Sequence, residues 1–91
     1  MAGDYNARTH AAFAAALARL EQLRREPTSR EQDCLAHALA YMACGNYLLA
    51  RVELRGFSRA LTSGETSFLA EGRPFSMAQL RRGHLRLGAF V

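Results

Sequence analysis

Isoleucine and lysine are absent from this chain of 91 residues, and valine occurs only at Val52 and Val91. Because β-branched residues favour strands, their scarcity argues against a β-sheet. Alanine, leucine and arginine dominate instead, and all three favour helices. The length suffices for one domain and not for two. We therefore expect an all-α fold in which residues 1–91 form a single helical domain.

The two cysteines, Cys34 and Cys44, are too few for a disulfide framework. They fall in one expected helix, ten residues apart, and a rise of about 15 Å is too long for a disulfide. We expect reduced, buried thiols, as in cytoplasmic proteins. No signal peptide is recognisable, and the alanine-rich residues 11–18 are too few to span a bilayer. These absences predict a cytoplasmic protein without a membrane partner.

Since lysine is absent, all twelve basic residues are arginines, and the net charge is +4. The excess positive charge falls in residues 46–91. An arginine-rich surface attracts phosphate groups or an acidic partner. A general arginine bias in the composition of the source genome explains the same count without any such partner.

Four helices are expected, separated by residues that interrupt helical structure. Asp4 can cap the first helix, and Pro27 prevents its continuation. Gly45 and Asn46 tolerate the left-handed backbone that ends a helix, and they mark the boundary between the second helix and the third. The expected helices cover about residues 5–25, 29–44, 46–62 and 76–87.

The second helix begins at a capping box, formed either by Thr28 with Glu31 or by Ser29 with Gln32. In such a box the hydroxyl accepts a hydrogen bond from an orphan backbone amide, and the acidic or amide side chain bonds back to the cap. Apolar residues recur in all four helices at spacings of three and four, which is typical of helices with a buried face. The expected core consists of Phe13, Ala16, Leu17, Leu20, Leu23, Leu35, Ala38, Leu39, Met42, Ala50, Leu54, Phe57, Leu61, Met77, Leu80, His84 and Leu87.

The third helix carries apolar residues on more than one side. Its core-facing seam starts at Tyr47, and Leu48, Leu49 and Val52 add apolar surface around the helix. Helices that are apolar on several sides lie between neighbours, so we expect the third helix at the centre of the domain. Its exposed side is expected to carry three arginines spaced by one turn, namely Arg51, Arg55 and Arg59.

The expected hairpin of the second and third helices resembles one tetratricopeptide repeat (TPR). The resemblance covers about residues 31–61 and is carried by Ala38, Tyr41, Gly45, Tyr47, Ala50, Leu54 and Phe57. The small residues let the two helices approach closely, and the tyrosines fill the space beside the turn. The resemblance implies a small four-helix bundle, or an α-hairpin array, with a TPR-like central hairpin and a protein-binding surface. In size and composition the chain also resembles the small helical chaperones of bacterial type III secretion, which cover the apolar helix of a secreted subunit.

Chemistry-bearing residues are sparse. Cys34, His37 and Cys44 share one helical face, and a zinc site would need His10 or His84 from other helices to complete it. Cysteine and histidine in helix interfaces are far more often packing residues, so we expect no metal and no cofactor. No catalytic motif or nucleotide-binding loop is present. We therefore do not expect an enzyme, and a small oligomeric enzyme is the alternative.

These observations predict a protein–protein interaction module that binds an amphipathic helix of a partner or a second copy of itself in a homodimer. The expected partner-binding residues are Tyr41, Tyr47, Leu48, Arg51, Val52, Arg55 and Arg59, with the arginines selecting an acidic partner. The alternative is a small regulator that binds DNA or RNA. Its phosphate contacts would come from Arg73, Arg81, Arg82 and Arg86.

Overall fold

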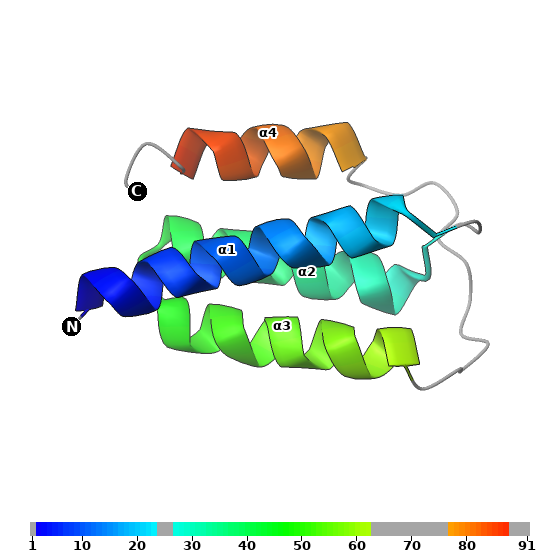
Figure 1. Cartoon of the computed structure of the whole chain (residues 1–91), viewed down its shortest axis with the longest axis horizontal. Coiled ribbons are helices and arrows are strands. Elements are labelled where there is room, and N and C mark those ends of the chain that lie inside the picture. The colour runs from blue at the N-terminus through cyan, green and yellow to red at the C-terminus, as the bar shows by residue number, and fades with distance from the viewer. Residues whose placement is uncertain (1, 24–26, 63–76, 88–91) are drawn as a thin grey trace.

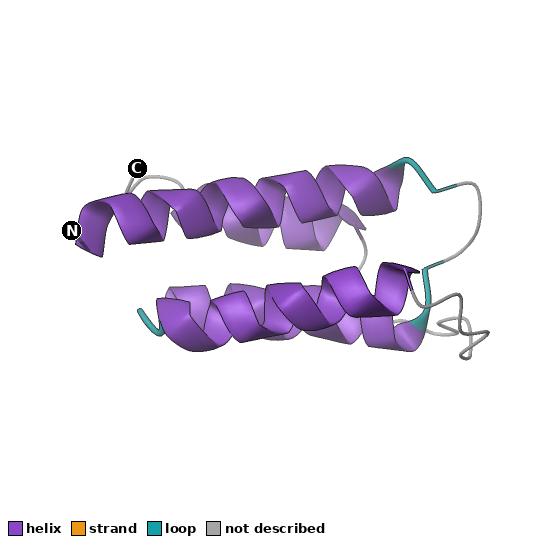
Figure 2. Cartoon of the chain, turned by 60° about the horizontal axis from the view of Figure 1, so that its bottom comes forward, coloured by secondary structure: helices purple, strands orange, loops and turns teal. Residues whose placement is uncertain are grey.

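The computed structural model describes residues 2–23, 27–62 and 77–87, which form four α-helices and no strand (Figure 1). The helices are α1 (Ala2–Glu21), α2 (Ser29–Ala43), α3 (Tyr47–Thr62) and α4 (Met77–Leu87). Figure 2 shows α1 and α4 on one side of the molecule and the α2–α3 hairpin on the other. The expectation of a small all-α bundle is confirmed.

The limits of α1 differ from the expected ones at both ends. The helix begins at Ala2, so Asp4 lies in its first turn instead of capping it, where a carboxylate still interacts favourably with the helix dipole. The helix ends at Glu21 instead of continuing to Arg25. The amide of Leu23 bonds the carbonyl of Leu20 at 3.2 Å, and such tightened final turns are common at helix ends. Residues 24–26 are outside the described part of the chain.

The capping box at the start of α2 is formed by Thr28 and Glu31. The Glu31 amide donates to Oγ1 of Thr28 at 3.1 Å, and the Thr28 amide donates to Oε1 of Glu31 at 2.7 Å. Both residues are buried, so the box satisfies backbone amides that water does not reach. Of the two pairings that the sequence allowed, this one is present in the structure.

Gly45 and Asn46 have different structural roles in the turn between α2 and α3. Gly45 has a φ of 81°, the left-handed conformation expected at a helix end. Asn46 was expected to share this role, but no described residue other than glycine has a positive φ. Its Oδ1 instead accepts a hydrogen bond from the Leu49 amide at 3.2 Å. Asn46 therefore caps α3, which allows α3 to begin directly after the turn.

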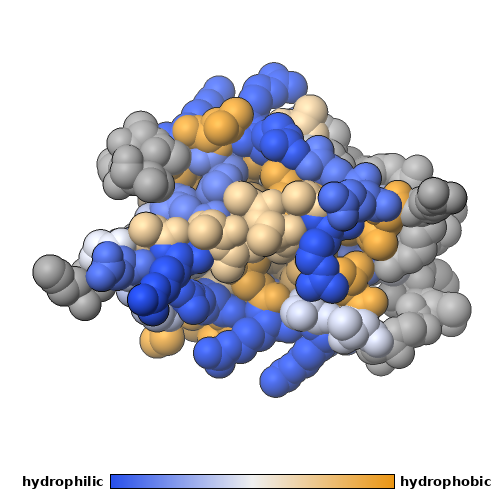
Figure 3. All heavy atoms as spheres, viewed as in Figure 1, coloured by the Kyte–Doolittle hydropathy of each residue, from blue (hydrophilic) through white to orange (hydrophobic). Residues whose placement is uncertain are grey.

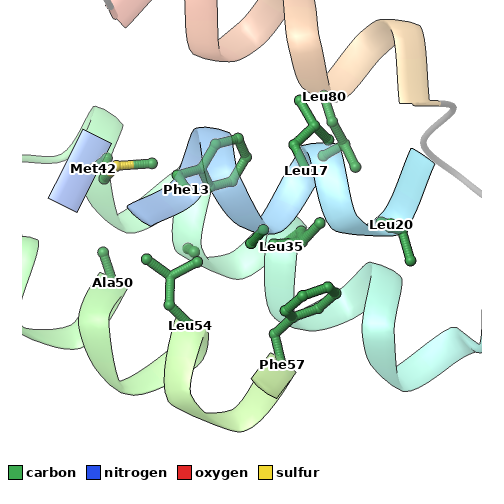
Figure 4. Packing of buried hydrophobic residues seen from close by; sticks show 11 residues of the cluster. Phe13, Leu17, Leu20, Leu35, Met42, Ala50, Leu54, Phe57 and Leu80 are labelled. Atoms are coloured by element: carbon green, nitrogen blue, oxygen red, sulfur yellow. The ribbon is translucent and has the colours of Figure 1, made fainter. Parts of the chain in front are cut away.

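All four helices contribute to the hydrophobic core (Figure 4). Its largest fully buried apolar side chains are Phe13 of α1, Leu35 of α2, Phe57 of α3 and Leu80 of α4. Most of the expected core positions are buried or partly buried. The period of three and four residues in the sequence therefore identified the core-facing side of each helix.

The expected central position of α3 is wrong. α2 contacts all three other helices, whereas α3 packs extensively on α2 and α1 and scarcely touches α4. Figure 1 shows α4 and α3 on opposite edges of the bundle. One side of α3 therefore faces away from every described helix, and its apolar residues on that side have no intramolecular partner in the described part of the chain.

Candidate functional site

The strongest candidate for a binding surface is the outer face of α3, defined by Leu48, Val52, Arg55 and Arg59. Spacings of four, three and four residues place these side chains on one side of the helix. Leu48 is 68% exposed and Val52 is 49% exposed, and both arginines are exposed. The face thus has an apolar half at the start of α3 and a basic half at its end.

Leu49 enlarges the apolar half of this face toward α2, because its side chain is 38% exposed. Tyr41 and Tyr47, which were also expected to contact a partner, are half-buried and pack against the core. They are therefore available at their edges only, and Leu48 and Val52 present most of the apolar area.

Arg51 lies apart from the other two arginines of α3 and is half-buried, contrary to the expected row of three exposed arginines. Its Nε donates to Oγ1 of Thr9 at 2.9 Å, and its Cζ lies 4.5 Å from the ring centroid of Tyr5. The Thr9 hydroxyl donates in turn to the Tyr5 carbonyl at 2.8 Å. The position of Arg51 one turn after Tyr47 turns it toward α1, where it joins the two helices through a cation–π contact and a hydrogen bond.

A partly buried polar cluster joins α1, α3 and α4. Nδ1 of His10 lies 3.1 Å from Nε2 of His84, and Nε2 of His10 lies 2.9 Å from the Tyr47 hydroxyl. The two imidazoles are stacked with centroids 5.2 Å apart, and the ring of Phe13 lies 4.7 Å from that of His84. His10 is only 5% exposed. We refer to His10, Tyr47 and His84 as the imidazole cluster.

Burial lowers the pKa of His10 below that of a free imidazole. Burial also lowers the pKa of His84, and the neighbouring His10 lowers it further. Both shifts favour neutral imidazoles, because a charged ring would lose hydration and would repel a second charge. His84 was expected to face the core, whereas the burial of His10 was not expected. The signal was present, because His10 continues the stripe of Phe13 and Leu17 at spacings of three and four.

The three residues considered as zinc ligands on the second helix, Cys34, His37 and Cys44, form no metal site. His37 is exposed and its Nδ1 lies 3.1 Å from Oε1 of Glu53 on α3. Cys44 is exposed rather than buried, because it follows the last residue of α2, and Cys34 is half-buried. Burial, followed by the charge of Glu53, raises the pKa of Cys34 and keeps its thiol protonated. Among the described residues, no group of three or more metal-binding side chains converges.

The arginines of α4 have different surroundings. Arg81 forms an ion pair with Glu21 at the end of α1. Arg82 and Arg86 are exposed and line, with Gln79 and Gly83, a shallow hollow of about 190 Å³. Arg73, the fourth arginine expected to contact phosphate, lies outside the described residues.

The outer face of α1 forms a second weakly apolar surface. Figure 3 shows a pale band across the middle of this side of the molecule, bordered by hydrophilic residues. The exposed side chains on this face of α1 are those of Ala7, Ala11, Ala14, Ala15 and Ala18. An alanine offers a single methyl group to a partner, so each of these positions buries far less area than a leucine or valine of α3.

Comparison with known protein families, with curated proteins and with solved structures gave no match for this chain. None of the four described helices has both the length and the apolar character needed to cross a lipid bilayer. The functional interpretation therefore depends on the surfaces and contacts described above.

Proposed function

We propose that this protein is a protein–protein interaction module that binds an acidic amphipathic helix on the outer face of α3. The observation that carries the proposal is the exposure of Leu48 and Val52, one turn apart on a helix that no other described helix covers on that side. Two apolar side chains with this spacing match the leucine stripe of a partner helix laid along α3. Tyr41, Tyr47 and Leu49 border the contact.

The basic half of the face determines which helix is favoured. Arg55 and Arg59 continue the line of Leu48 and Val52 toward the end of α3. A partner with acidic residues one to two turns beyond its apolar stripe pairs with these arginines when its stripe lies over Leu48 and Val52. Exposed ion pairs add little affinity, about 0.2 to 1 kcal/mol each, but they fix the orientation and disfavour basic partners.

The TPR-like hairpin expected from the sequence is compatible with this proposal. The contact between α2 and α3 is the most extensive in the bundle, and Ala38 and Ala50 are fully buried in it. Small residues at such positions keep the hairpin rigid and leave the outer side of its second helix free for a partner. A role like that of the type III secretion chaperones, which shield an apolar helix of another protein, would use this surface.

The test uses a designed amphipathic peptide with a leucine stripe flanked by glutamates, labelled for fluorescence anisotropy. We expect it to bind the wild-type chain, and we expect L48S/V52S to weaken binding by about 2 kcal/mol, or roughly 30-fold, because two largely exposed side chains lose the area they would bury. L85S is the matched control, since Leu85 on α4 is 67% exposed. L85S should bind as the wild type does.

Two results would contradict the proposal. One is the absence of binding, and the other is an equal loss in L48S/V52S and L85S, which would mean that the peptide adsorbs to any exposed leucine. Analytical ultracentrifugation of each protein without peptide measures its oligomeric state, which tests whether a second copy of the chain occupies the face instead. A wild-type dimer that becomes monomeric in L48S/V52S would show that the face binds a second copy of this chain instead.

The hollow beside Arg82 and Arg86 supports a second candidate function, contact with nucleic-acid phosphates through α4. Two guanidinium groups one turn apart can each bind a phosphate. Such binding weakens steeply as salt increases, whereas binding to an apolar face is nearly insensitive to salt. We expect a salt titration with labelled single-stranded and duplex DNA to separate the two functions, and salt-sensitive binding lost in R82E/R86E would support this one.

A further inference from the structure

Only Tyr47 of the imidazole cluster borders the proposed binding face, and the composition of the cluster is unusual for a helix interface. His10 of α1 contacts both Tyr47 of α3 and His84 of α4, where hydrophobic side chains would otherwise pack. Buried polar groups need their hydrogen bonds, so each member depends on the position of the others. His84 is the member that brings α4 into the network.

The geometry of the cluster admits a limited number of protons. When both rings are neutral, one proton lies between Nδ1 of His10 and Nε2 of His84, and the Tyr47 hydroxyl either donates to or accepts from the other nitrogen of His10. A first added proton creates a charge on one of two rings that are partly shielded from water, His10 more than His84. A second added proton places two N–H groups face to face at 3.1 Å and removes their hydrogen bond. The doubly protonated pair is therefore incompatible with the observed contact.

We propose that the contact between His10 and His84 is a proton-sensitive latch, which holds α4 on the bundle in neutral solution and releases it in mildly acidic solution. This inference is independent of the proposed function, because it concerns neither Leu48 nor Val52. Release is local rather than global because α4 is weakly attached. Of the α4 side chains whose burial is described, only Leu80 is fully buried, and His84 is half-buried.

The surrounding charges do not oppose the latch. Neither imidazole is bonded to a carboxylate within the described residues. Both partners of the Arg81–Glu21 pair are engaged with each other, as are His37 and Glu53. The acidic residues of α2, Glu31 and Asp33, lie in its first two turns, where the Glu31 carboxylate accepts a hydrogen bond from the Thr28 amide. The remaining charged or titratable groups on the helices around the pair are Asp4, Tyr5, Arg8, Arg19, Arg30, Cys34, Tyr41, Cys44, Arg51, Arg55, Arg59, Arg82 and Arg86.

The direction of the pH effect follows from the lowered pKa values of both histidines. Well above the usual histidine pKa of about 6.5, the rings are neutral whether α4 is docked or released, and docking has no proton penalty. As the pH falls below that value, the released form takes up protons more readily than the docked form, so docking weakens. A ring that stays neutral when α4 is docked, and has the usual histidine pKa when α4 is released, lowers the equilibrium constant for docking as the pH falls. Each such ring contributes at most about a tenfold change between about pH 7.5 and pH 5.5.

The amide hydrogen exchange of α4 measures its release directly. A helix of eleven residues is not stable on its own, so a released α4 loses its protected amides. Exchange rates are compared with the intrinsic rate at each pH, which removes the chemical effect of pH on exchange. We expect the protection of the α4 amides to fall by about tenfold, and by at most about a hundredfold, between about pH 7.5 and pH 5.5. The amides of α2 and α3 should change by less than about threefold.

The chain contains three histidines, which provides a matched control. H37Q removes the exposed histidine and should retain the full pH response of α4, whereas H84Q should abolish it. If H84Q leaves α4 unprotected at every pH, this variant is not informative, and an NMR titration of the imidazole resonances in the wild-type protein takes its place. His10 and His84 should then titrate below the usual histidine pKa of about 6.5, together with the loss of α4 protection. Unchanged α4 protection at about pH 5.5, equal losses in all four helices, or a full response in H84Q would each overturn the proposal.

Discussion

Gly83 lets α4 approach α2 closely, and this close approach makes a quantitative prediction. A Cβ atom at position 83 would lie 2.7 Å from Cδ2 of Leu39 and 3.7 Å from its Cγ. Alanine in place of a glycine inside a helix stabilises the helix by about 1 kcal/mol. Here the added methyl group must displace the Leu39 side chain or push α4 outward, and overpacking of this kind costs about 1 to 3 kcal/mol. We therefore expect G83A to lower the free energy of unfolding by about 1 kcal/mol.

The clash is tested by removing the side chain that causes it. In an L39A background the methyl groups that face Gly83 are absent, so G83A should raise the free energy of unfolding by about 1 kcal/mol, the helix-propensity gain alone. The two effects of the same substitution then differ by about 2 kcal/mol, which is a coupling energy typical of residues in direct contact. G56A is the matched control, because a Cβ atom there meets only Sγ of Cys34, at 3.4 Å. It should stabilise the wild-type protein.

Urea unfolding followed by circular dichroism measures all five proteins, namely the wild type, G83A, L39A, the double variant and G56A. Chains of this length unfold in one cooperative transition, so each curve gives a free energy and a slope. If G83A stabilises the wild type as much as it stabilises L39A, the coupling between Gly83 and Leu39 is refuted. That result would mean that Leu39 moves aside freely and that α4 and α2 do not need a glycine between them.

Three further substitutions test the turn, the cap and the core by the same unfolding measurement. G45A should cost about 1 kcal/mol, because a residue with a Cβ atom is strained at a φ of 81°, and a fully stable variant would contradict the turn assignment. T28A should cost about 1 to 2 kcal/mol, since it removes the cap and leaves the buried Glu31 without its hydroxyl partner. F57A should cost about 3 to 5 kcal/mol, because it empties the space of a fully buried ring between the helices. A loss below about 1 kcal/mol would show that the α3 seam is loosely packed.

The sequence predicted the helices well because their boundaries are determined locally. The capping box at Thr28 and the left-handed glycine at Gly45 depend on residues within one turn, so a linear reading identifies them. The apolar stripes also predicted the buried side of each helix. The predicted end of α1 was wrong. Pro27 shows where α1 can no longer continue, but the sequence does not show how many residues before Pro27 are helical.

The neighbours of each helix were harder to predict. Apolar residues on several sides of α3 indicated a central helix, but Leu48 and Val52 are apolar without being covered, and periodicity alone does not distinguish the two cases. The contact of His10 with Tyr47 and His84 joins residues separated by 37 and 74 positions. Arg51 was assigned to solvent because it is charged, whereas Thr9 and Tyr5 of another helix hold it. The apolar stripe of α1 indicates that His10 is buried, but which residues pair with each other depends on tertiary packing and leaves no local signal.

The measurement that tests the binding face most directly exchanges its charge. Arg55 and Arg59 are replaced in R55E/R59E, and affinity is measured for two designed peptides that share one leucine stripe but carry either glutamates or lysines beside it. Wild-type protein should prefer the glutamate peptide by about threefold or more, and R55E/R59E should prefer the lysine peptide by a similar factor. R82E/R86E, with the same change of charge on α4, should keep the wild-type preference. An unchanged preference in R55E/R59E, or a reversal in R82E/R86E, would show that the partner helix does not lie on α3.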